Sequence, residues 1–385
     1  MPPEQSQSSA SSDQTRTTAE TEGCEAVGGQ VDGGSEVSQA PPFKAQMVWR
    51  NVGLFIFLHG GAAYGLYLFL SGQAMLYTFL FSVWLFVLGG MGITAGAHRL
   101  WSHKSYKATW PLKLYLVFCN SIALQNDIIE WCRDHRVHHK FSETDADPHN
   151  AKRGFWFSHM GWLMMRKHPD VRRKGQSVDI SDLTADPILR FQRKYYVPLA
   201  ITCCLVMPTV VPAWLWGESY VTAYFTAGLL RYCYTLHATW SVNSLAHMFG
   251  YRPYDKKINP RQNMTSVLLT LGEGWHNYHH TFPWDYRASE YPWRFNLTTF
   301  FIDLWCWLGL ASDARRVDSE VIQRRKVKHG DGTALHPEPE PEPRWQPRKQ
   351  AAGTGAGSGT TSSGHNISCD SLVLGAASVG GGTGI

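Results

Sequence analysis

The sequence predicts an all-α integral membrane protein in which four transmembrane helices carry a helical cytosolic cap with a histidine-rich site. Two observations predict this fold class. Nine of the 17 histidines fall into three tight clusters and one separate position. Four segments approach the roughly 20 apolar residues that span a bilayer, and they lie at about 52–71, 74–97, 198–216 and 220–242.

The composition changes sharply on either side of these segments. Residues 1–42 are rich in Ser, Thr, Gln and Gly, and residues 334–385 combine a Pro-Glu repeat with a Gly/Ser-rich end. Such segments cannot bury enough apolar surface to fold. We therefore expect two disordered tails around one membrane domain, residues 43–333. The net charge of +5 is modest, and we expect no nucleic-acid partner.

The four apolar segments form two hairpins, and their charged flanks predict the topology. The short connections near residues 72 and 218 carry no Lys or Arg. The opposite ends are basic, with Lys44, Arg50, Arg99, Lys104, Lys107, Arg193, Lys194, Arg252, Lys256 and Lys257. By the positive-inside rule, both termini and the loop 98–197 are then cytosolic. The cysteines form no regular framework, which fits free thiols facing a reducing compartment.

Two further apolar stretches are expected to lie along the membrane surface. Residues 110–125 are interrupted by Lys113, and residues 296–310 are interrupted by Asp303. Both are short for a span and amphipathic, as interfacial helices are.

The clustered histidines have helical spacing. His135, His138 and His139 stand at positions i, i+3 and i+4, as do His276, His279 and His280. These positions share one face of a helix, so each triplet is expected to aim three imidazoles at one point. Asn243 and His247 are also four apart. His98 and His103 are five apart, and we expect the second span to end near Leu100, with His103 supplied by the turn beyond.

Nine imidazoles predict a metal centre with two ions. Neutral imidazole is the commonest metal ligand in proteins, and three or four protein ligands suffice for one zinc ion. Nitrogen ligands suit zinc, copper, iron or nickel, and a cage beside a membrane fits iron that activates oxygen above an apolar substrate. Glu273 is expected to support a ligand at most. His237 is ambiguous, and the remaining histidines are interpreted as ordinary: His59, His149, His159, His168, His329, His336 and His365.

These motifs resemble one known family. The runs GITAGAHRLWSHKSYKA, QNDIIEWCRDHRVHHK, NSLAHMFGYRPYDK and GEGWHNYHHTFPWDYR are similar to animal acyl-CoA Δ9 desaturases, most of all to insect members. The resemblance covers about residues 43–333, through the closing RRKVKHGDGT. It implies a membrane protein of the endoplasmic reticulum that inserts a cis double bond into a saturated fatty acyl-CoA. It also implies the use of O2 and of electrons from cytochrome b5 and its NADH-dependent reductase.

The resemblance further implies roles for individual residues. Two iron ions would be held by His98, His103, His135, His138, His139, His247, His276, His279 and His280, with Asn243 holding a water bound to iron. Contacts to the acyl-CoA would come from Asn51, Asn126, Arg133, Asp134, Arg166, Lys167 and Trp240. Cationic side chains suit the CoA phosphates. On the residues alone, the basic side chains could equally be a solvated cap near anionic lipid, and Trp240 an aromatic of the membrane interface.

Other functions remain open at this point. A related membrane hydroxylase shares the histidine cages, and Leu245 and Ser241 depart from the usual family pattern, so the regioselectivity could differ. A front-end desaturase is disfavoured, because its third cluster usually begins with Gln where this chain has His276. A metal carrier should place its ligands inside the spans, and a catalytically inactive scaffold typically lacks a ligand.

The second span also suggests where a substrate tunnel ends. Phe86 and Gly90 lie twelve and eight residues before His98. In an α-helix this corresponds to roughly 12–18 Å at ~1.5 Å per residue. We expect Gly90 to leave room for the end of an acyl chain and Phe86 to close the tunnel. Ordinary close packing of two spans at a glycine is an equal alternative.

Overall fold

The computed structural model describes residues 44–291, 293 and 295–333, together with the backbone of 366–367. The two predicted disordered tails therefore lie almost entirely outside the described residues. Within them the chain is mostly helical, and short strands pair as β1 (Lys107–Ala108) with β2 (Ala311–Ser312) and β3 (Ala314–Arg315) with β4 (Asn366–Ile367).

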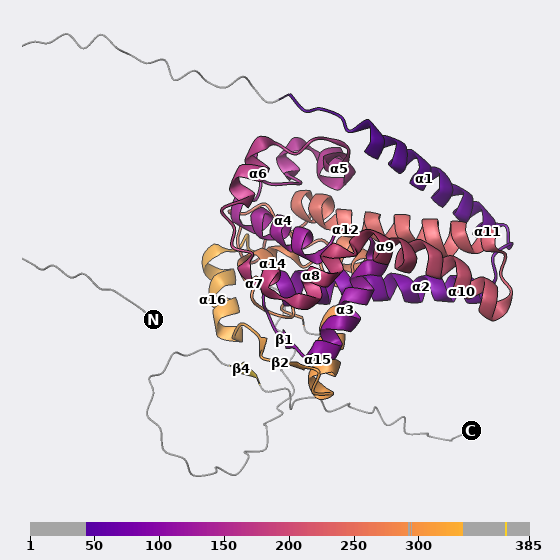
Figure 1. The fold of residues 1–385 in the computed structure, drawn as a ribbon. Helices are drawn as coiled ribbons and strands as arrows, with labels where there is room; N and C mark the ends of the chain where they lie inside the picture. The colour runs from indigo at the N-terminus through magenta and orange to yellow at the C-terminus, as the bar shows by residue number, and fades with distance from the viewer. Residues whose placement is uncertain (1–43, 292, 294, 334–365, 368–385) are drawn as a thin grey trace, which may run out of the picture. The chain divides into compact units, whose positions relative to one another are not determined.

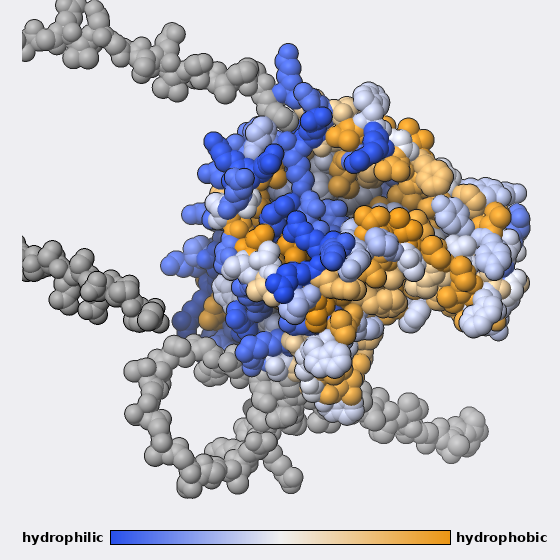
Figure 2. Space-filling model, in the orientation of Figure 1, coloured by the Kyte–Doolittle hydropathy of each residue, from blue (hydrophilic) through white to orange (hydrophobic). Residues whose placement is uncertain are grey.

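Three of the predicted spans are long, apolar helices. They are α1 (Trp49–Leu70), the continuous helix Leu76–Ser102, and the continuous helix Tyr196–Trp216, which comprises α9 (Tyr196–Ile201), η4 (Thr202–Val206) and α10 (Met207–Trp216). Their hydrophobic side chains cover one side of the molecule, whereas hydrophilic side chains gather around α6 and α16 (Figures 1 and 2). This division is the one expected of a membrane-embedded part and a solvated cap.

The fourth predicted span is helical but differs from the other three. It runs without a break from Tyr220 to Met248 as α11 (Tyr220–Ala223), η5 (Tyr224–Leu230) and α12 (Arg231–Met248). It is not among the three described helices that are long and apolar enough to cross a membrane. The buried Arg231 illustrates why, because its guanidinium donates to the carbonyl oxygens of Ile122 and Cys204. Polar groups that face neighbouring helices lower the apolarity of this segment.

The second span ends close to the expected position. α2 (Leu76–Met91) continues as a π-helix, η1 (Gly92–Ser102), which ends two residues beyond Leu100, and His103 follows it with its N–H donating to the His98 carbonyl at 3.1 Å. A π-helix bonds residues five apart, so His98 and His103 come to the same face with ring centroids 5.0 Å apart. The five-residue spacing, which a straight α-helix does not stack, suits this geometry.

The remaining helices follow the second and fourth long helices. Asp127 caps α4 (Ile128–Phe141) by accepting from the Glu130 N–H, which satisfies an otherwise unpaired backbone donor. The other elements are α3 (Trp110–Ala123), η2 (Ala151–Arg153), η3 (Phe157–Gly161), α5 (Trp162–Met164), α6 (Pro169–Gly175), α7 (Ser181–Ala185), α8 (Pro187–Lys194), α13 (Met264–Leu269), α14 (His276–Thr281), α15 (Leu297–Trp307) and α16 (Ser319–His329).

Helices α3 and α15 correspond to the two segments expected at the membrane surface. In α3, Leu112 and Leu116 are buried in a core that also includes residues of η1, α4 and α15. On its other side Trp110, Leu114 and Phe118 are exposed. An apolar helix with one buried and one exposed apolar face fits the predicted interfacial position.

Candidate metal centre

The nine predicted ligands converge as two groups of imidazoles. Within each group the candidate ligand atoms all lie within 4.8 Å of one another. The five-histidine group is His98, His103, His135, His139 and His279, and the four-histidine group is His138, His247, His276 and His280. Both groups lie among η1, α4, α12 and α14, and most of their rings are deeply buried.

Each helical triplet is split between the two groups, which contradicts the expectation that its three imidazoles point at one site. In α4, His135 and His139 belong to the five-histidine group, whereas His138 belongs to the four-histidine group. In α14 the pair four apart joins the four-histidine group, and His279 joins the other. Residues four apart are closer in direction around a helix than residues three apart. Each helix therefore lies between the two groups and contributes to both.

The ring nitrogens approach one another at contact distance. Five Nε2–Nε2 distances lie between 2.8 and 3.0 Å: His98–His279, His103–His135, His279–His139, His276–His247 and His280–His276. A nitrogen such as His279 Nε2, which has two such neighbours, cannot donate one hydrogen to both. Nitrogens that face one another in this way can serve as the donor set of a metal ion.

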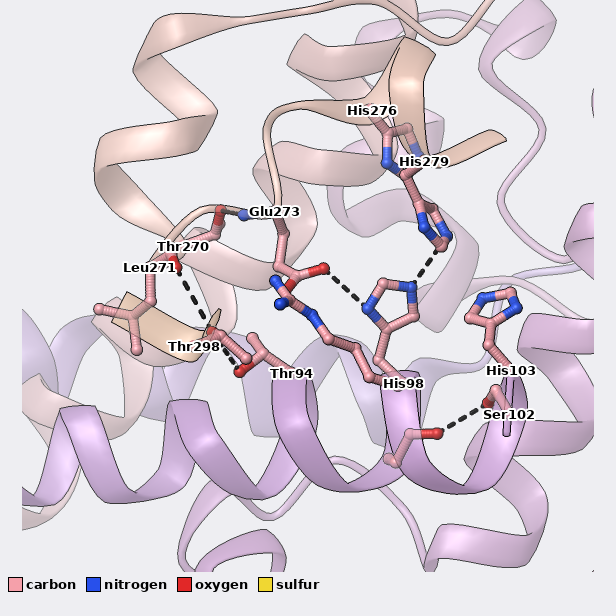
Figure 3. Close-up of polar contacts among 12 residues, drawn as sticks. Thr94, His98, Ser102, His103, Thr270, Leu271, Glu273, His276, His279 and Thr298 are labelled. Carbon is pink, nitrogen blue, oxygen red and sulfur yellow. Dashed lines mark hydrogen bonds and ion pairs between the residues drawn. The ribbon is translucent and has the colours of Figure 1, made fainter. Parts of the chain in front are cut away.

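Buried carboxylates lie within hydrogen-bonding distance of the Nδ1 atoms of three of the rings. Glu273 Oε2 lies 2.7 Å from His98 Nδ1, as Figure 3 shows, and Glu143 Oε1 lies 2.9 Å from His247 Nδ1. Asp147 Oδ1 lies 3.0 Å from His138 Nδ1. An ionised carboxylate only accepts hydrogen bonds, so each Nδ1 carries the hydrogen. The Nε2 lone pair is then directed into the group, which is the arrangement that second partners impose on metal-binding histidines.

The surroundings of Glu273 and Asp147 favour their charged forms. Burial alone would raise the pKa of Glu273, but Arg99 and His98 lower it to about 2. Arg99 NH2 donates to Glu273 Oε1 at 2.7 Å. The pKa of Asp147 is likewise below its usual range despite burial, because His138 and His149 lie beside it. Glu273 confirms the expectation that it supports a ligand.

The imidazoles themselves are kept neutral. Burial, followed by neighbouring histidines, lowers the pKa of six rings well below the usual value: His103, His135, His139, His276, His279 and His280. A neutral ring offers a lone pair, and an imidazolium does not. The residues present therefore fit two transition-metal ions at neutral pH.

An apolar cavity begins at this cage and extends along the second long helix. His98, His135, His138 and His276 line one part of it, together with Asn243. Phe86 and Gly90 line another part of the same cavity. Leu271, with a φ of +61°, forms a wall opposite Gly90. Four of the predicted histidine ligands and the predicted tunnel end thus line one cavity.

Sequence reasoning missed several residues of the site. Trp131 and His149 line the cavity, and the His149 ring lies 4.4 Å from that of His138. Glu143 and Asp147 belong to the irregular segment after α4, where periodicity carries no signal. The only sign in the sequence was that several acidic residues follow closely after a histidine cluster.

The residues expected to contact the acyl-CoA head group do not line the cavity. Arg133 donates to Asp134 at 2.8 Å, and Lys167 also forms an ion pair with Asp134. The Arg166 main chain bonds to Gln46, and Asn51 Nδ2 donates to the Leu163 carbonyl at 2.7 Å. Asn126 adopts a positive φ of 73° directly before α4. These residues gather on and around α4 and the segment after α5.

Trp240 is buried rather than exposed. Only 3% of its surface is accessible, and its ring packs against Phe55 at 5.5 Å and His237 at 5.1 Å. The alternative interpretation of Trp240 as an aromatic of the membrane interface is therefore wrong, because such residues face the lipid headgroups.

Replacing Glu273 with glutamine is expected to weaken metal retention without unfolding the protein. The amide keeps the shape of the side chain but loses the charge that orients His98. Loss of such an outer partner typically costs about 10–100-fold in metal affinity. Metal per chain after dialysis against a graded chelator measures the effect. Glu290→Gln is the control, because Glu290 pairs with Lys326, away from the histidines. Equal retention by both variants would refute the role of Glu273.

Comparison with known proteins gives a consistent result. Residues 75–294 match the family described as fatty acid desaturase. The chain is 57% identical over 291 residues to stearoyl-CoA desaturase 5 of Bos taurus, which covers 76% of this chain and 86% of that protein. It is 54% identical to the Delta(9)-fatty-acid desaturase fat-6 of Caenorhabditis elegans, with 77% and 87% covered. It is 55% identical to the acyl-CoA Delta-9 desaturase of Acheta domesticus, with 76% and 81% covered.

Proposed function

Because the chain belongs to the fatty acid desaturase family, we propose that its nine histidines hold two iron ions beside the acyl chain of the substrate. The reaction is the Δ9 desaturation of a fatty acyl-CoA, an oxidation. The observation that carries the metal assignment is the convergence of nine imidazoles as two groups beside an apolar cavity. Iron would supply the activation of O2 and the removal of two hydrogen atoms.

The protein's own contribution is to position the chain. An unactivated methylene offers no charge for recognition, so selectivity must come from the walls that hold it. The cavity runs from the histidines to Phe86 and Gly90, and Trp131, Thr239 and Leu271 are among the residues that line it. Asn243 lines the same cavity and would hold a water bound to iron. The carboxylates Glu273, Glu143 and Asp147 fix the rings so that the ligand nitrogens stay directed inward.

We further propose that the CoA head group binds to residues of α4 and of the segments near it. Arg133 and Lys167 are already drawn together by Asp134. Together with Asn51, Asn126 and Arg166 they offer donors for phosphate oxygens. With the head group fixed there, the distance to the histidines would select the bond that is oxidised. Trp240, which is buried, would also contact the acyl-CoA.

The remaining assignments concern the membrane and the electron source. We propose that the chain lies in the endoplasmic reticulum membrane with four spans, the fourth being Tyr220–Val242, and with both termini in the cytosol. Cytochrome b5 and its NADH-dependent reductase would deliver electrons to the cap, and O2 would be the oxidant. The polar surface around α6 and α16 is where such soluble partners could reach the protein (Figure 2).

The metal content provides the direct test. Purified, active protein is expected to contain two iron atoms per chain, and zinc-loaded protein is expected to be inert because zinc has no redox chemistry. Elemental analysis is combined with fatty-acid profiling in a desaturase-deficient yeast. One metal atom per chain, or turnover supported by zinc, would contradict the proposed centre.

The proposed topology predicts that the sequons beginning at Asn263, Asn296 and Asn366 remain unglycosylated. All three would face the cytosol. The fold adds a second reason at Asn296, which is buried and whose Nδ2 donates to the Arg287 carbonyl at 2.7 Å. Treatment of the native protein with a glycosidase is expected to leave its mass unchanged, and a mass decrease would overturn the four-span arrangement.

A further inference from the structure

A second array of histidines lies outside the nine-histidine cage and connects α1 with α12. His59 Nε2 lies 3.0 Å from His237 Nε2, and His237 Nδ1 lies 2.9 Å from His159 Nε2. The array ends on two backbone carbonyls. His59 Nδ1 lies 2.7 Å from the Phe55 carbonyl oxygen, and His159 Nδ1 lies 2.9 Å from Ser244 Oγ, which donates to the Trp240 carbonyl at 3.0 Å.

Counting hydrogens shows that this array is incomplete. It contains five contacts between polar atoms, and each needs one hydrogen. A neutral imidazole carries one hydrogen, a hydroxyl carries one, and a carbonyl carries none. Three neutral rings and Ser244 therefore supply four hydrogens for five contacts. One contact therefore lacks a hydrogen, and a cation, either an additional proton or a metal ion, would complete it.

The direction of the hydrogen bonds places the gap between His59 and His237. The Phe55 carbonyl only accepts, so His59 Nδ1 carries the hydrogen and His59 Nε2 keeps its lone pair. At the other end Ser244 donates to the Trp240 carbonyl, so His159 Nδ1 donates to Ser244 Oγ. His237 Nδ1 then donates to His159 Nε2, and His237 Nε2 also keeps its lone pair. Two lone pairs face each other across 3.0 Å.

A third ligand stands at the same place. Cys233 precedes His237 by four residues on α12, so the two share a face, and its sulfur lies within 4.8 Å of the ligand atoms of His59 and His237. Cys233 is buried among Leu58, Leu236 and Trp240 and forms no hydrogen bond within the described part of the chain. A free thiol beside two unprotonated imidazole nitrogens is a ligand set for a soft metal ion.

We propose that His59, Cys233 and His237 form a third metal site that takes copper(I), with His159 as the residue that orients His237. Binding would replace the thiol hydrogen: Cu⁺ joins the sulfur, and one proton is released to solvent. The resulting thiolate and Cu⁺ cancel in charge. An additional proton on a ring, or Zn²⁺ with one thiolate, would leave a net positive charge among apolar side chains, which is costly there.

This site would tie the first long helix to the helix that carries part of the metal centre. His59 belongs to α1, whereas Cys233 and His237 belong to α12 together with Asn243 and His247. Without a clamp, α1 contacts α12 mainly through apolar and ring contacts such as Phe55 against Trp240. Copper would therefore fix the position of Trp240 and of the helix surface beside it.

The test uses full-length, iron-loaded protein in detergent under reducing conditions. Copper(I) is titrated in competition with a chromophoric copper(I) chelator, while iron per chain is counted. One copper per chain is expected, without loss of iron. Cys233→Ala and His237→Ala are expected to weaken copper binding by more than the roughly 10–100-fold expected for His159→Ala, whose residue acts through His237. Cys203→Ala, which removes a half-buried thiol elsewhere, is the control.

Two readouts separate this site from copper bound elsewhere. X-ray absorption of the copper-loaded wild-type protein is expected to give one sulfur and two nitrogen neighbours, a result that requires no variant to fold. Zinc is titrated in parallel and is expected to bind more weakly. Copper binding that survives Cys233→Ala, a copper environment without sulfur, or zinc that binds these residues more tightly than copper would overturn the assignment. Absence of any binding would mean that a proton completes the array.

Discussion

Replacing His247 with alanine is expected to leave one iron ion per chain and to abolish desaturation. His247 belongs to the four-histidine group, so its loss leaves three imidazoles. It also leaves Glu143 without its hydrogen-bond partner in a buried position. Both effects act on the same ion. The loss of activity is therefore expected to exceed the roughly 10–100-fold cost of removing an outer partner such as Glu273.

The matched variants test whether the two groups are separate. His139→Ala removes a ligand from the five-histidine group and is expected to release the other ion while the four-histidine group keeps its own. His329→Ala, on α16 and outside both groups, is expected to retain both ions. Iron per chain and product formation are measured for all three. Loss of both ions in His247→Ala, in protein that still folds, would show that the groups do not bind metal independently.

The candidate metal centre shows which features of a site the local sequence pattern can predict. Helical spacing singled out the two triplets, His135/His138/His139 and His276/His279/His280, because positions three and four apart share a helix face whatever the rest of the fold does. It could not show that His138 and His139 would belong to different groups. That division depends on how α4 and α14 lie relative to each other, which is a tertiary property. Likewise, Glu143 meets His247 across 104 residues of sequence.

The second span illustrates a different limit. Its apolar run predicted a helix, and the structure has one from Leu76 to Ser102. The five-residue spacing of His98 and His103 conflicted with α-helical geometry and was resolved by assuming a turn. A π-helix resolves it without breaking the helix, but this rare conformation carries no propensity signal. A π-helix also rises less per residue than an α-helix, so Gly90 lies nearer His98 than the α-helical estimate.

The histidines that were interpreted as ordinary show most clearly what a local sequence pattern cannot predict. His59 and His159 each stand alone in the sequence, where an isolated histidine predicts nothing. His237 was ambiguous because it lies within an apolar segment. The contact between His59 and His237 joins residues 178 positions apart. Only the fold brings them together beside Cys233.

Replacing Gly90 with phenylalanine is expected to shift the substrate preference toward shorter acyl chains while activity on those chains persists. Gly90 lines the same cavity as Phe86 and the histidines. Even a Cβ at this position would lie 2.7 Å from Leu271 Cδ1, the end of a flexible side chain. A phenyl ring would fill the cavity there. Because one methylene in an apolar pocket is worth about 10–200-fold in kcat/KM, the ratio of long-chain to short-chain products should fall at least about tenfold.

The adjacent glycine provides the control that separates a tunnel from ordinary helix packing. A Cβ at Gly89 would meet Ala123 and Ile122 of α3 at 3.5 Å, an ordinary contact, and Gly89 is not among the residues that line the cavity. Gly90→Ala is therefore expected to produce a smaller shift in the same direction, and Gly89→Ala none. Competing acyl-CoA substrates of different length, assayed in one reaction, measure the ratio directly. If Gly90→Phe lowered activity on every chain length equally while remaining folded, Gly90 would serve the packing of the helices and the cavity would end elsewhere.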